Sequence, residues 1–443
     1  MEISEGAMAV IECLQRAGFE AFAVGGCVRD SLMGIAPHDY DVATDAPPNE
    51  AMRVFKDFRV IPTGIKHGTI TVISQGEPVE VTTYRIDGEY RDSRHPDSVS
   101  FTASIEEDLS RRDFTINGIA YSPSRGYVDP FGGAEDIARG VIRCIGDADR
   151  RFSEDSLRII RALRFSSTLG FRVDGDTAES MIRNRELLQR VSAERIFTEL
   201  SRLLCGGSIR QTMLEFSEIF AQIIPYLGEE IGYEQCSPYH DSTLYEHTAR
   251  AVEAAEPSAE LRFAMLLHDI GKPFCRSEDE GGVCHYYGHA QKSTALAEEI
   301  LRELKCGNAF RERVCGIVRY HDIPVDLSER YIRRQLSKHG LEELRDIFLA
   351  HIADDSAKQP FCRERIPLAR QAIAEAERIA AEKPCLGLKE LAVNGNDLSG
   401  IVPPSPEMGR VLKVLLEEVI DGKIPNDREQ LLARAKQAAY RCT

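Results

Sequence analysis

The chain has 443 residues, 43% of them hydrophobic, and a formal net charge of −16 at pH 7. This length predicts about two to four domains with packed cores, and the acidic charge argues against tight non-specific binding to a nucleic-acid backbone. No apolar run is long enough to span a bilayer, no secretory signal is expected, and twelve cysteines without a CxxC pair indicate free thiols in a cytoplasmic protein.

The first elements of the chain predict a phosphate-binding turn. Residues 3–17 carry apolar side chains at helical spacing, and the apolar residues 22–24 predict a buried strand. Gly25-Gly26 follows, where the missing Cβ atoms let the backbone turn sharply and approach a ligand. A short helix is expected next, and its first N–H groups together with Arg29 would attract an anion.

Two aspartates follow this turn, Asp39 and Asp41, in a segment that we expect to be a strand. Residues two apart on a strand face the same side, so the two carboxylates would lie together beside the phosphates. Hard oxygen ligands in that position suit Mg²⁺, which can activate a hydroxyl and stabilise a leaving pyrophosphate.

This stretch, VGGCVRDSLMGIAPHDYDV, resembles the first motif of the DNA polymerase beta-like nucleotidyltransferases. It is most similar to the class II branch, which holds bacterial CCA-adding tRNA nucleotidyltransferases and bacterial poly(A) polymerases. The resemblance implies a third carboxylate on a later strand. Glu80, between two valines, is the candidate, and a structural salt bridge is an equal alternative.

Two loops come next. Residues 59–74 predict two short strands around a glycine-rich bend, where Lys66 or His67 either face phosphates or are plain loop residues. Residues 84–101 are charged and turn-rich, which predicts a mobile loop or a solvated hairpin. This loop resembles the flexible loop that is implicated in the switch from C to A addition in CCA-adding enzymes, and it differs from that of poly(A) polymerases.

The stretch EEDLSRRDFTINGIA resembles the RRDFTxNA motif of the same family, with Gly118 where alanine is usual. The resemblance implies that Arg112 binds the triphosphate and that Asp113 accepts a hydrogen bond from a ribose hydroxyl. A carboxylate on the 2′-hydroxyl is a physical way to select ribonucleotides. Asn117 is a further candidate for nucleotide binding.

The stretch RFSEDSLRIIRALRFSSTLGF predicts a helix with Ser153 as its N-cap. Its polar residues recur every three positions, which alone is typical of an exposed ion-pair helix. These residues are Asp155, Arg158, Arg161 and Arg164.

The pattern EDxxRxxRxxRF resembles the nucleotide-selecting motif of the family. The resemblance implies that Asp155 accepts from an exocyclic amino group while Arg158 donates to the base. Cytosine and adenine both offer an amino group beside a ring-nitrogen acceptor, so one protein site can accept each in turn. Glu154 is expected to orient Arg158, and a helix over 192–204 to brace the motif.

A second group of residues has metal-ligand character. Six of the eleven histidines fall between positions 240 and 321, and one His-Asp pair ends an apolar helical run before a Gly-Lys-Pro break. Mixed nitrogen and oxygen ligands of this kind suit a divalent metal whose identity the pattern does not specify. The predicted ligands are His247, His268, Asp269 and Asp354, with His289 and His321 for a second metal or a phosphate.

This second pattern resembles the HD phosphohydrolase domain. Some CCA-adding enzymes carry such a domain, which implies phosphatase or cyclic phosphodiesterase activity toward phosphate esters. Residues 391–427 resemble the C-terminal segment of CCA-adding enzymes, where the tail holds the tRNA elbow.

Together these resemblances imply an α+β fold. A nucleotidyltransferase head with a small mixed sheet over 1–140 would precede an all-α neck over 141–225, an HD domain over 226–360 and a helical tail over 361–443. The implied reaction adds CCA to the tRNA 3′ end from CTP and ATP without a nucleic-acid template. The alternatives are an A-adding or CC-adding partial enzyme, a poly(A) polymerase, or a metal phosphohydrolase with an RNA-binding N-terminal module.

Overall fold

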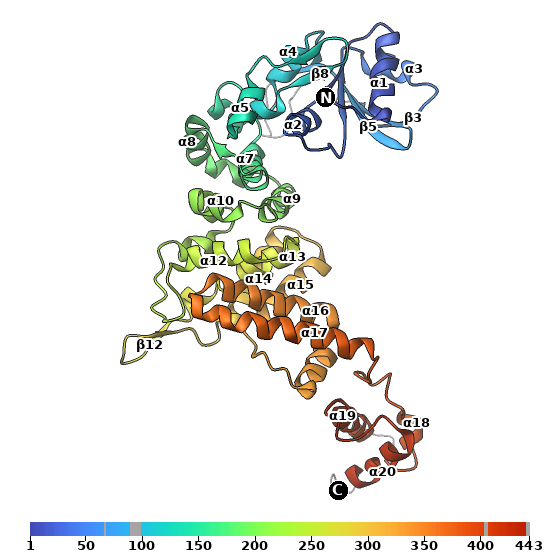
Figure 1. The fold of residues 1–443 in the computed structure, drawn as a ribbon, viewed down its shortest axis with the longest axis vertical. Coiled ribbons are helices and arrows are strands. Elements are labelled where there is room, and N and C mark those ends of the chain that lie inside the picture. The colour runs from blue at the N-terminus through green and yellow to red at the C-terminus, as the bar shows by residue number, and fades with distance from the viewer. Residues whose placement is uncertain (66–67, 89–98, 403–405, 440–443) are drawn as a thin grey trace. The chain divides into compact units, whose positions relative to one another are not determined.

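The computed structural model describes residues 1–65, 68–88, 99–402 and 406–439, and divides into two compact units, Met1–Gly228 and Glu229–Thr443. The first unit contains a sheet and helices and the second is almost entirely helical (Figure 1), so the predicted α+β class is confirmed. Lys66, His67 and most of the loop over 84–101 lie outside the described residues. The division into head, neck, HD domain and tail stays a prediction.

One mixed sheet organises the first unit. In the described residues it has seven strands in the order β3-β4-β5-β2-β1-β8-β9. All neighbouring pairs are antiparallel except β2 and β5, which run parallel and place Asp41 opposite Glu80. The strands are β1 Ala21–Val24, β2 Asp41–Thr44, β3 Arg59–Gly64, β4 Thr69–Ser74, β5 Glu77–Thr83, β8 Ala120–Ser122 and β9 Gly126–Val128.

Five helices accompany this sheet: α1 Glu5–Arg16, α2 Gly26–Leu32, α3 Pro48–Val54, α4 Ile105–Ser110 and α5 Gly133–Arg139. The predicted first helix is confirmed as α1, which buries Val10, Ile11 and Leu14 and packs against β1, β4 and β5. The sheet's core includes Phe22 and Tyr84, both buried. This packing fixes the ends of β1 and β2, where the glycine turn and the aspartates lie.

One local expectation in this part needs correction. Strand β2 begins at Asp41, so Asp39 precedes the strand instead of lying within it. The ends of the loop over 84–101 pair as two short antiparallel strands, β6 Arg85–Asp87 and β7 Val99–Phe101, as the hairpin alternative predicts. Both strands of that pair are only three residues long.

Helices then continue the first unit (green in Figure 1): α6 Ala148–Glu154, α7 Leu157–Leu169, α8 Gly175–Arg183, α9 Ala193–Leu204, α10 Ile209–Glu215 and α11 Ser217–Ile223. The prediction of Ser153 as an N-cap is wrong, because it lies inside α6, where its hydroxyl donates to Asp149 O at 2.8 Å. Asp147 caps α6 instead, through a hydrogen bond from Arg150 N. The helical backbone is interrupted at Asp155, which has an extended conformation (φ −145°, ψ 100°), and α7 begins after this interruption.

The second unit is a helical assembly, whose main helices are α12 Leu244–Ala254, α13 Ala259–Leu267, α14 His289–Glu303, α15 Asn308–Tyr320, α16 Glu329–Ala357 and α17 Ile366–Ala381. A two-stranded hairpin, β12 Ser277–Glu278 with β13 Cys284–His285, precedes α14. Helix α16 packs against α12, α13, α15 and α17, and it is interrupted at Gly340, where φ is 73°. The predicted boundary at 360/361 falls within a 3₁₀ helix, Pro360–Arg365.

The chain ends in helices α18 Gly395–Leu398, α19 Pro406–Ile420 and α20 Arg428–Ala439, which surround an apolar core of their own. Buried Leu398, Leu415 and Leu431 contribute to that core. Among the helices of the described ranges, none combines the length and apolar character that crossing a membrane requires.

Candidate active sites

The glycine turn lies where β1 ends and α2 begins. Gly25 has a φ of 74°, and a Cβ atom added there would lie 2.9 Å from Nη1 of Arg112. Only glycine therefore lets this arginine approach the turn. Arg29 is held by two acceptors: Nη1 donates to Asn117 Oδ1 at 2.9 Å, and Nη2 donates to Asp30 Oδ1 at 2.7 Å.

The carboxylates gather beside this turn. Asp39 and Asp41 line the same cavity, and Glu80 is the register partner of Asp41 across the parallel strand pair. Desolvation and the nearby Glu80 and Asp39 charges raise the pKa of Asp41 to about 6, against the lowering effect of Arg112. Among the described residues no cation forms an ion pair with Glu80. Crowded carboxylates of this kind favour a bound cation.

The cavity itself has a volume of about 390 Å³ and is strongly polar. It brings together every nucleotide-binding candidate and both aspartates, although these come from separate segments of the chain. Its lining residues are Gly25, Gly26, Arg29, Asp39, Asp41, Arg111, Arg112, Asp113, Asn117, Asp155, Arg158, Arg161, Arg164 and Phe165.

Two residues of the cavity were missed by the sequence analysis. Phe165 carries the guanidinium groups of Arg164, Arg29 and Arg161 at 4.1, 5.2 and 5.5 Å from its ring centroid. Arg111 pairs with the buried Asp108 at 2.9 Å. In the sequence the phenylalanine directly follows the last arginine of the RxxRF pattern, and this adjacency could have identified it as a residue of the cavity.

A chain of ion pairs fixes the rear of the cavity. Arg161 Nη2 lies 2.7 Å from Asp113 Oδ2 and its Nη1 lies 3.4 Å from Glu199, while Arg164 Nε lies 2.6 Å from Glu199. Burial alone would raise the pKa of Asp113, but Arg161 and a hydrogen bond from Asn117 lower it to about 2. Asp113 is therefore ionised and oriented, and its predicted contact with a ribose stays a prediction.

The base-selecting candidates are held just as firmly. Arg158 donates to Glu154 Oε2 at 2.9 Å and to two backbone carbonyls. Asp155 accepts from Arg195 Nη2 at 2.8 Å and from the Leu157 N–H at 3.2 Å. Because Asp155 interrupts the helix, its carboxylate and the first arginine of α7 both face the cavity. Such fixed partners preorganise a recognition site.

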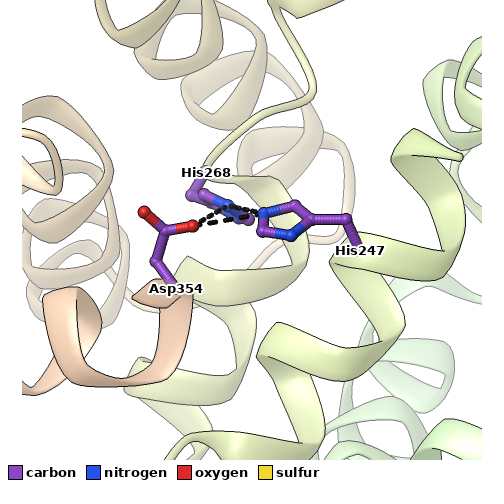
Figure 2. A group of neighbouring side chains, drawn as sticks. All are labelled: His247, His268 and Asp354. Carbon is purple, nitrogen blue, oxygen red and sulfur yellow. Dashed lines mark hydrogen bonds and ion pairs between the residues drawn. The ribbon is translucent and has the colours of Figure 1, made fainter. Parts of the chain in front are cut away.

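In the second unit, His247 from α12, His268 after α13 and Asp354 from α16 point toward one another (Figure 2). His247 Nε2 lies 3.2 Å from both His268 Nε2 and Asp354 Oδ1. These three residues form one group able to hold a metal ion, and Asp269, His289 and His321 form a second. Asp269 lies between the groups.

The distances show how Asp269 joins the two groups. Its Oδ2 lies 3.1 Å from His268 Nε2, and its Oδ1 lies 3.4 Å from His289 Nε2 and 3.7 Å from His321 Nε2. The structure therefore brings together all six predicted ligands, and we call this set the His–Asp centre. One carboxylate that faces two ligand groups is suited to bridging a pair of metal ions.

Backbone carbonyls fix the tautomers of three of these histidines. The Nδ1 atoms of His268, His289 and His321 lie 2.7, 2.9 and 2.7 Å from carbonyl oxygens of the preceding turn. A carbonyl only accepts, so Nδ1 carries a proton and Nε2 is the ring nitrogen that faces the centre. Burial alone would lower the pKa of His268, but the Asp269 and Asp354 carboxylates raise it to about 10. The two carboxylates therefore stabilise a positive charge within the centre.

Two lysines complete the His–Asp centre, Lys272 buried and Lys358 half-buried, and the sequence pattern did not indicate a role for either. Lys272 Nζ lies 2.6 Å from Asp269 Oδ2, and Lys358 Nζ lies 2.5 Å from Asp354 Oδ2. Lys358 follows Asp354 by one helical turn, and this spacing could have indicated the ion pair from the sequence. Both cations offset the negative charge of the ligand carboxylates.

A glycine turn, an aspartate pair and converging arginines in a small mixed sheet define a nucleotidyltransferase head. The poly(A) polymerase head domain model matches residues 21–143, the model of a probable RNA- and SrmB-binding site of polymerase A matches 170–230, and a tRNA nucleotidyltransferase domain 2 matches 287–435. The last match covers part of the region that was predicted to be an HD domain.

Relatives that align over almost the whole chain identify the family within the nucleotidyltransferases. The CCA-adding enzymes of Geobacillus kaustophilus and Geobacillus stearothermophilus are 34% and 33% identical, over 97% and 96% of this chain and 96% and 95% of their own. The crystal structure of the Bacillus stearothermophilus CCA-adding enzyme in complex with CTP is 30% identical, covers 99% of this chain and 98% of its own, and gives a TM-score of 0.78. The chain belongs to the CCA-adding enzymes, a family of tRNA nucleotidyltransferases.

Proposed function

We propose that this chain adds CCA to the 3′ end of tRNA, using CTP and ATP and no nucleic-acid template, in the cytoplasm. The observation that carries the proposal is the single cavity that unites two carboxylates, two triphosphate-binding arginines and a fixed Asp-Arg pair. Solved structures of CCA-adding enzymes include complexes with CTP, with ATP and with tRNA. The predicted loop over 84–101 favours full CCA addition over CC addition alone.

In this proposal Asp39 and Asp41 hold Mg²⁺, which supplies a Lewis acid for the attacking 3′-hydroxyl and for the leaving pyrophosphate. Glu80, beside Asp41 in the sheet, is the proposed third carboxylate. Gly25, Gly26, Arg29 and Arg112 bind the triphosphate, with Asn117 orienting Arg29.

Base choice is proposed to rest on hydrogen bonds from the protein. Asp155 accepts from the amino group that cytosine and adenine share, and Arg158 donates to the neighbouring ring nitrogen or carbonyl. Uracil and guanine lack this combination at the same edge. Arg161 and Arg164 support the pair through the Glu199 network.

The test is the 3′-end sequence of a tRNA transcript that lacks CCA, after incubation with enzyme, Mg²⁺ and all four nucleotides. We expect a product that ends in CCA and stops there. CC alone, A alone on a CC-ended control, or a long A tract would each replace the proposal with the corresponding partial enzyme or poly(A) polymerase. Asp39→Ala should abolish addition, whereas Asp57→Ala, at an exposed aspartate outside the cavity, should not.

A second proposed activity belongs to the His–Asp centre: hydrolysis of phosphate esters with a divalent metal, as in HD domains. The convergence of Nε2 atoms on Asp269 and Asp354 supports it. His247, His268, Asp269 and Asp354 would hold one ion, and His289 and His321 a second ion or a phosphate.

Metal content and ester hydrolysis test this second proposal separately. Protein dialysed against Mn²⁺ or Co²⁺ should retain metal and hydrolyse p-nitrophenyl phosphate or its diester. His268→Ala should lose both properties and keep CCA addition, while Asp57→Ala, at an exposed aspartate of the first unit outside the cavity, should keep all three. Wild-type protein that retains no metal would exclude the HD assignment.

A further inference from the structure

Two cysteines lie next to each other in the second unit, outside the ligand sets described above. Cys236 is exposed and precedes α12, and Cys284 begins β13 and is only 5% exposed. The Cys284 N–H donates to the Cys236 carbonyl at 3.0 Å, so the two backbones touch at these positions. A hydrogen bond between the thiols raises the pKa of Cys236 above its ordinary value, and the neighbouring Arg276 opposes this effect.

Arg276 adds a cation to the pair. Its Nη2 lies 3.8 Å from Cys236 Sγ, and the guanidinium interacts with both thiols. The guanidinium charge favours the thiolate, which is the reactive form in exchange with a disulfide, and it offsets part of the rise in the pKa of Cys236 that the thiol–thiol hydrogen bond causes. An exposed thiol beside a buried thiol and a cation is therefore arranged for two successive exchange steps.

The cysteine pair adjoins residues that hold the His–Asp centre. Gln235, next to Cys236, accepts from Lys272 Nζ at 3.1 Å through its side chain and from Tyr286 Oη at 2.8 Å through its carbonyl. Tyr286 in turn accepts from His289 Nδ1 at 2.9 Å. A covalent bond between Cys236 and Cys284 would thus fix the two segments that orient Lys272 and His289.

We propose that Cys236 and Cys284 form a reversible disulfide by exchange with a low-molecular-weight disulfide, and that this bond slows metal release from the His–Asp centre. The exposed Cys236 thiolate attacks the small disulfide, which releases one thiol and leaves a mixed disulfide. Cys284 then gives up its proton and attacks Cys236 Sγ, which releases the second thiol. The small disulfide is reduced to two thiols, and the protein dithiol is oxidised to one disulfide.

Peptide mapping tests the bond. Reduced full-length protein is incubated with oxidised glutathione, its free thiols are blocked with N-ethylmaleimide, and the digest is mapped without reduction. We expect a linked pair of peptides that contain Cys236 and Cys284, which dithiothreitol separates. Wild-type protein that stops at a glutathione adduct on Cys236, or that links other cysteines instead, would overturn the proposal.

Single variants sharpen the mapping. Cys284→Ser should accumulate the glutathione adduct at Cys236, because the resolving thiol is gone. Cys236→Ser should leave Cys284 unmodified, because that thiol is only 5% exposed. Cys275→Ser, a matched control at a half-buried cysteine, should still form the link. Equal adducts at positions 236 and 284 in the single variants would contradict the assigned order of attack.

The effect on the centre rests on the metal site proposed above and has its own readout, the transfer of Co²⁺ from the protein to EDTA, followed by visible absorption. Oxidised wild type should release Co²⁺ several-fold more slowly than reduced wild type, and oxidant should not change the rate in Cys236→Ser. Equal rates would refute the coupling. Protein that forms the disulfide and binds no Co²⁺ in either state would refute the metal site and leave the disulfide standing.

Discussion

At the scale of single residues, ion pairs with oppositely charged side chains position the arginines at the cavity of the first unit. Glu199 is only 6% exposed and pairs with two arginines of α7, while Asp113 takes the other side of Arg161. A buried cation without a counter-charge is unfavourable, so the position of each arginine depends on Glu199. The proposed base selection would therefore depend on a residue that lies outside the cavity lining.

We predict that Glu199→Gln weakens discrimination between nucleotides more than it weakens folding. The variant keeps the side-chain shape but removes the charge that orients Arg164. We expect the ratio of kcat/KM for CTP over UTP to fall by about tenfold, the size of one charge-assisted hydrogen bond. Glu215→Gln, at an exposed position of α10, serves as the control. An unchanged ratio in a folded variant would show that Glu199 does not set selectivity.

A second residue-scale prediction concerns pH. Glu230 is fully buried, and desolvation raises its pKa to about 8 although Thr248 donates to it. The folded protein therefore binds a proton that the unfolded chain, with an ordinary pKa of 4.5, releases earlier. Its contribution to stability is fully present below about pH 4.5 and is lost as the pH rises through about 8.

Urea denaturation followed by circular dichroism at several pH values tests this dependence. Glu230→Gln should flatten the decline in unfolding free energy between about pH 4.5 and 8, because glutamine does not titrate. Glu229→Gln, at the exposed neighbour, should keep the wild-type slope. The same slope in Glu230→Gln would mean that other groups cause the decline.

At the scale of elements, breaks in helices matter as much as the helices. The interruption at Asp155, the C-cap of α6, separates α6 from α7, and both Asp155 and the arginines of α7 line the cavity. The break at Gly340 divides α16 into a segment that buries Ile332 and Leu336 and a segment that carries Asp354 and ends at Ala357. Gly340 has a φ of 73° and a ψ of 173°, which side chains with a Cβ adopt only under strain.

We therefore predict that Gly340→Ala lowers the free energy of unfolding by about 1–3 kcal/mol. Gly409→Ala provides a contrast, because Gly409 lies in α19 and a Cβ there meets no atom within 4 Å. That change should raise stability by about 0.5–1 kcal/mol, since alanine is a better helix former. Thermal and urea unfolding measure both effects, and a neutral Gly340→Ala would show that the break relaxes without strain.

At the scale of the whole molecule, each proposed reaction centre lies within one of the two compact units. The nucleotidyltransferase cavity uses residues of the first unit, and the His–Asp centre uses residues of the second. Within the second unit, one carboxylate joins the last helices to the long helix α16. Asp421 lies 2.6 Å from Arg334, 2.9 Å from Arg330 and 2.9 Å from Lys423.

We predict that Asp421→Asn loosens helices α18 to α20 from α16 without unfolding either part, because it removes the shared charge and leaves the apolar core of those helices intact. Hydrogen exchange in 395–439 should become faster, and the KM for tRNA should rise while kcat changes little. Asp427→Asn, whose carboxylate caps the next helix instead, is the matched control. Unchanged exchange in Asp421→Asn would show that apolar packing alone fixes the tail.

The sequence determined the local chemistry of both sites. Glycine at the turn, the aspartate pair and the arginine repeat are read from residue type and short spacing, because such motifs depend on local backbone geometry. The mixed α+β class and the amphipathic helices follow in the same way from apolar periodicity. Local patterns predicted less well where neighbouring residues compete for one role, so Ser153 was predicted as the N-cap of the arginine-bearing helix although it lies inside α6 and Ser156 occupies that position.

Only the tertiary structure decided which distant residues meet. The parallel pairing of β2 with β5 brings Glu80 to Asp41, and the packing of α9 against α7 brings Glu199 to the arginines. The same holds for the hydrogen bond from Lys272 to Gln235 and for the contact between Cys236 and Cys284. Such contacts join segments tens of residues apart, and their energy comes from packing and desolvation of whole elements, which no short stretch of sequence encodes.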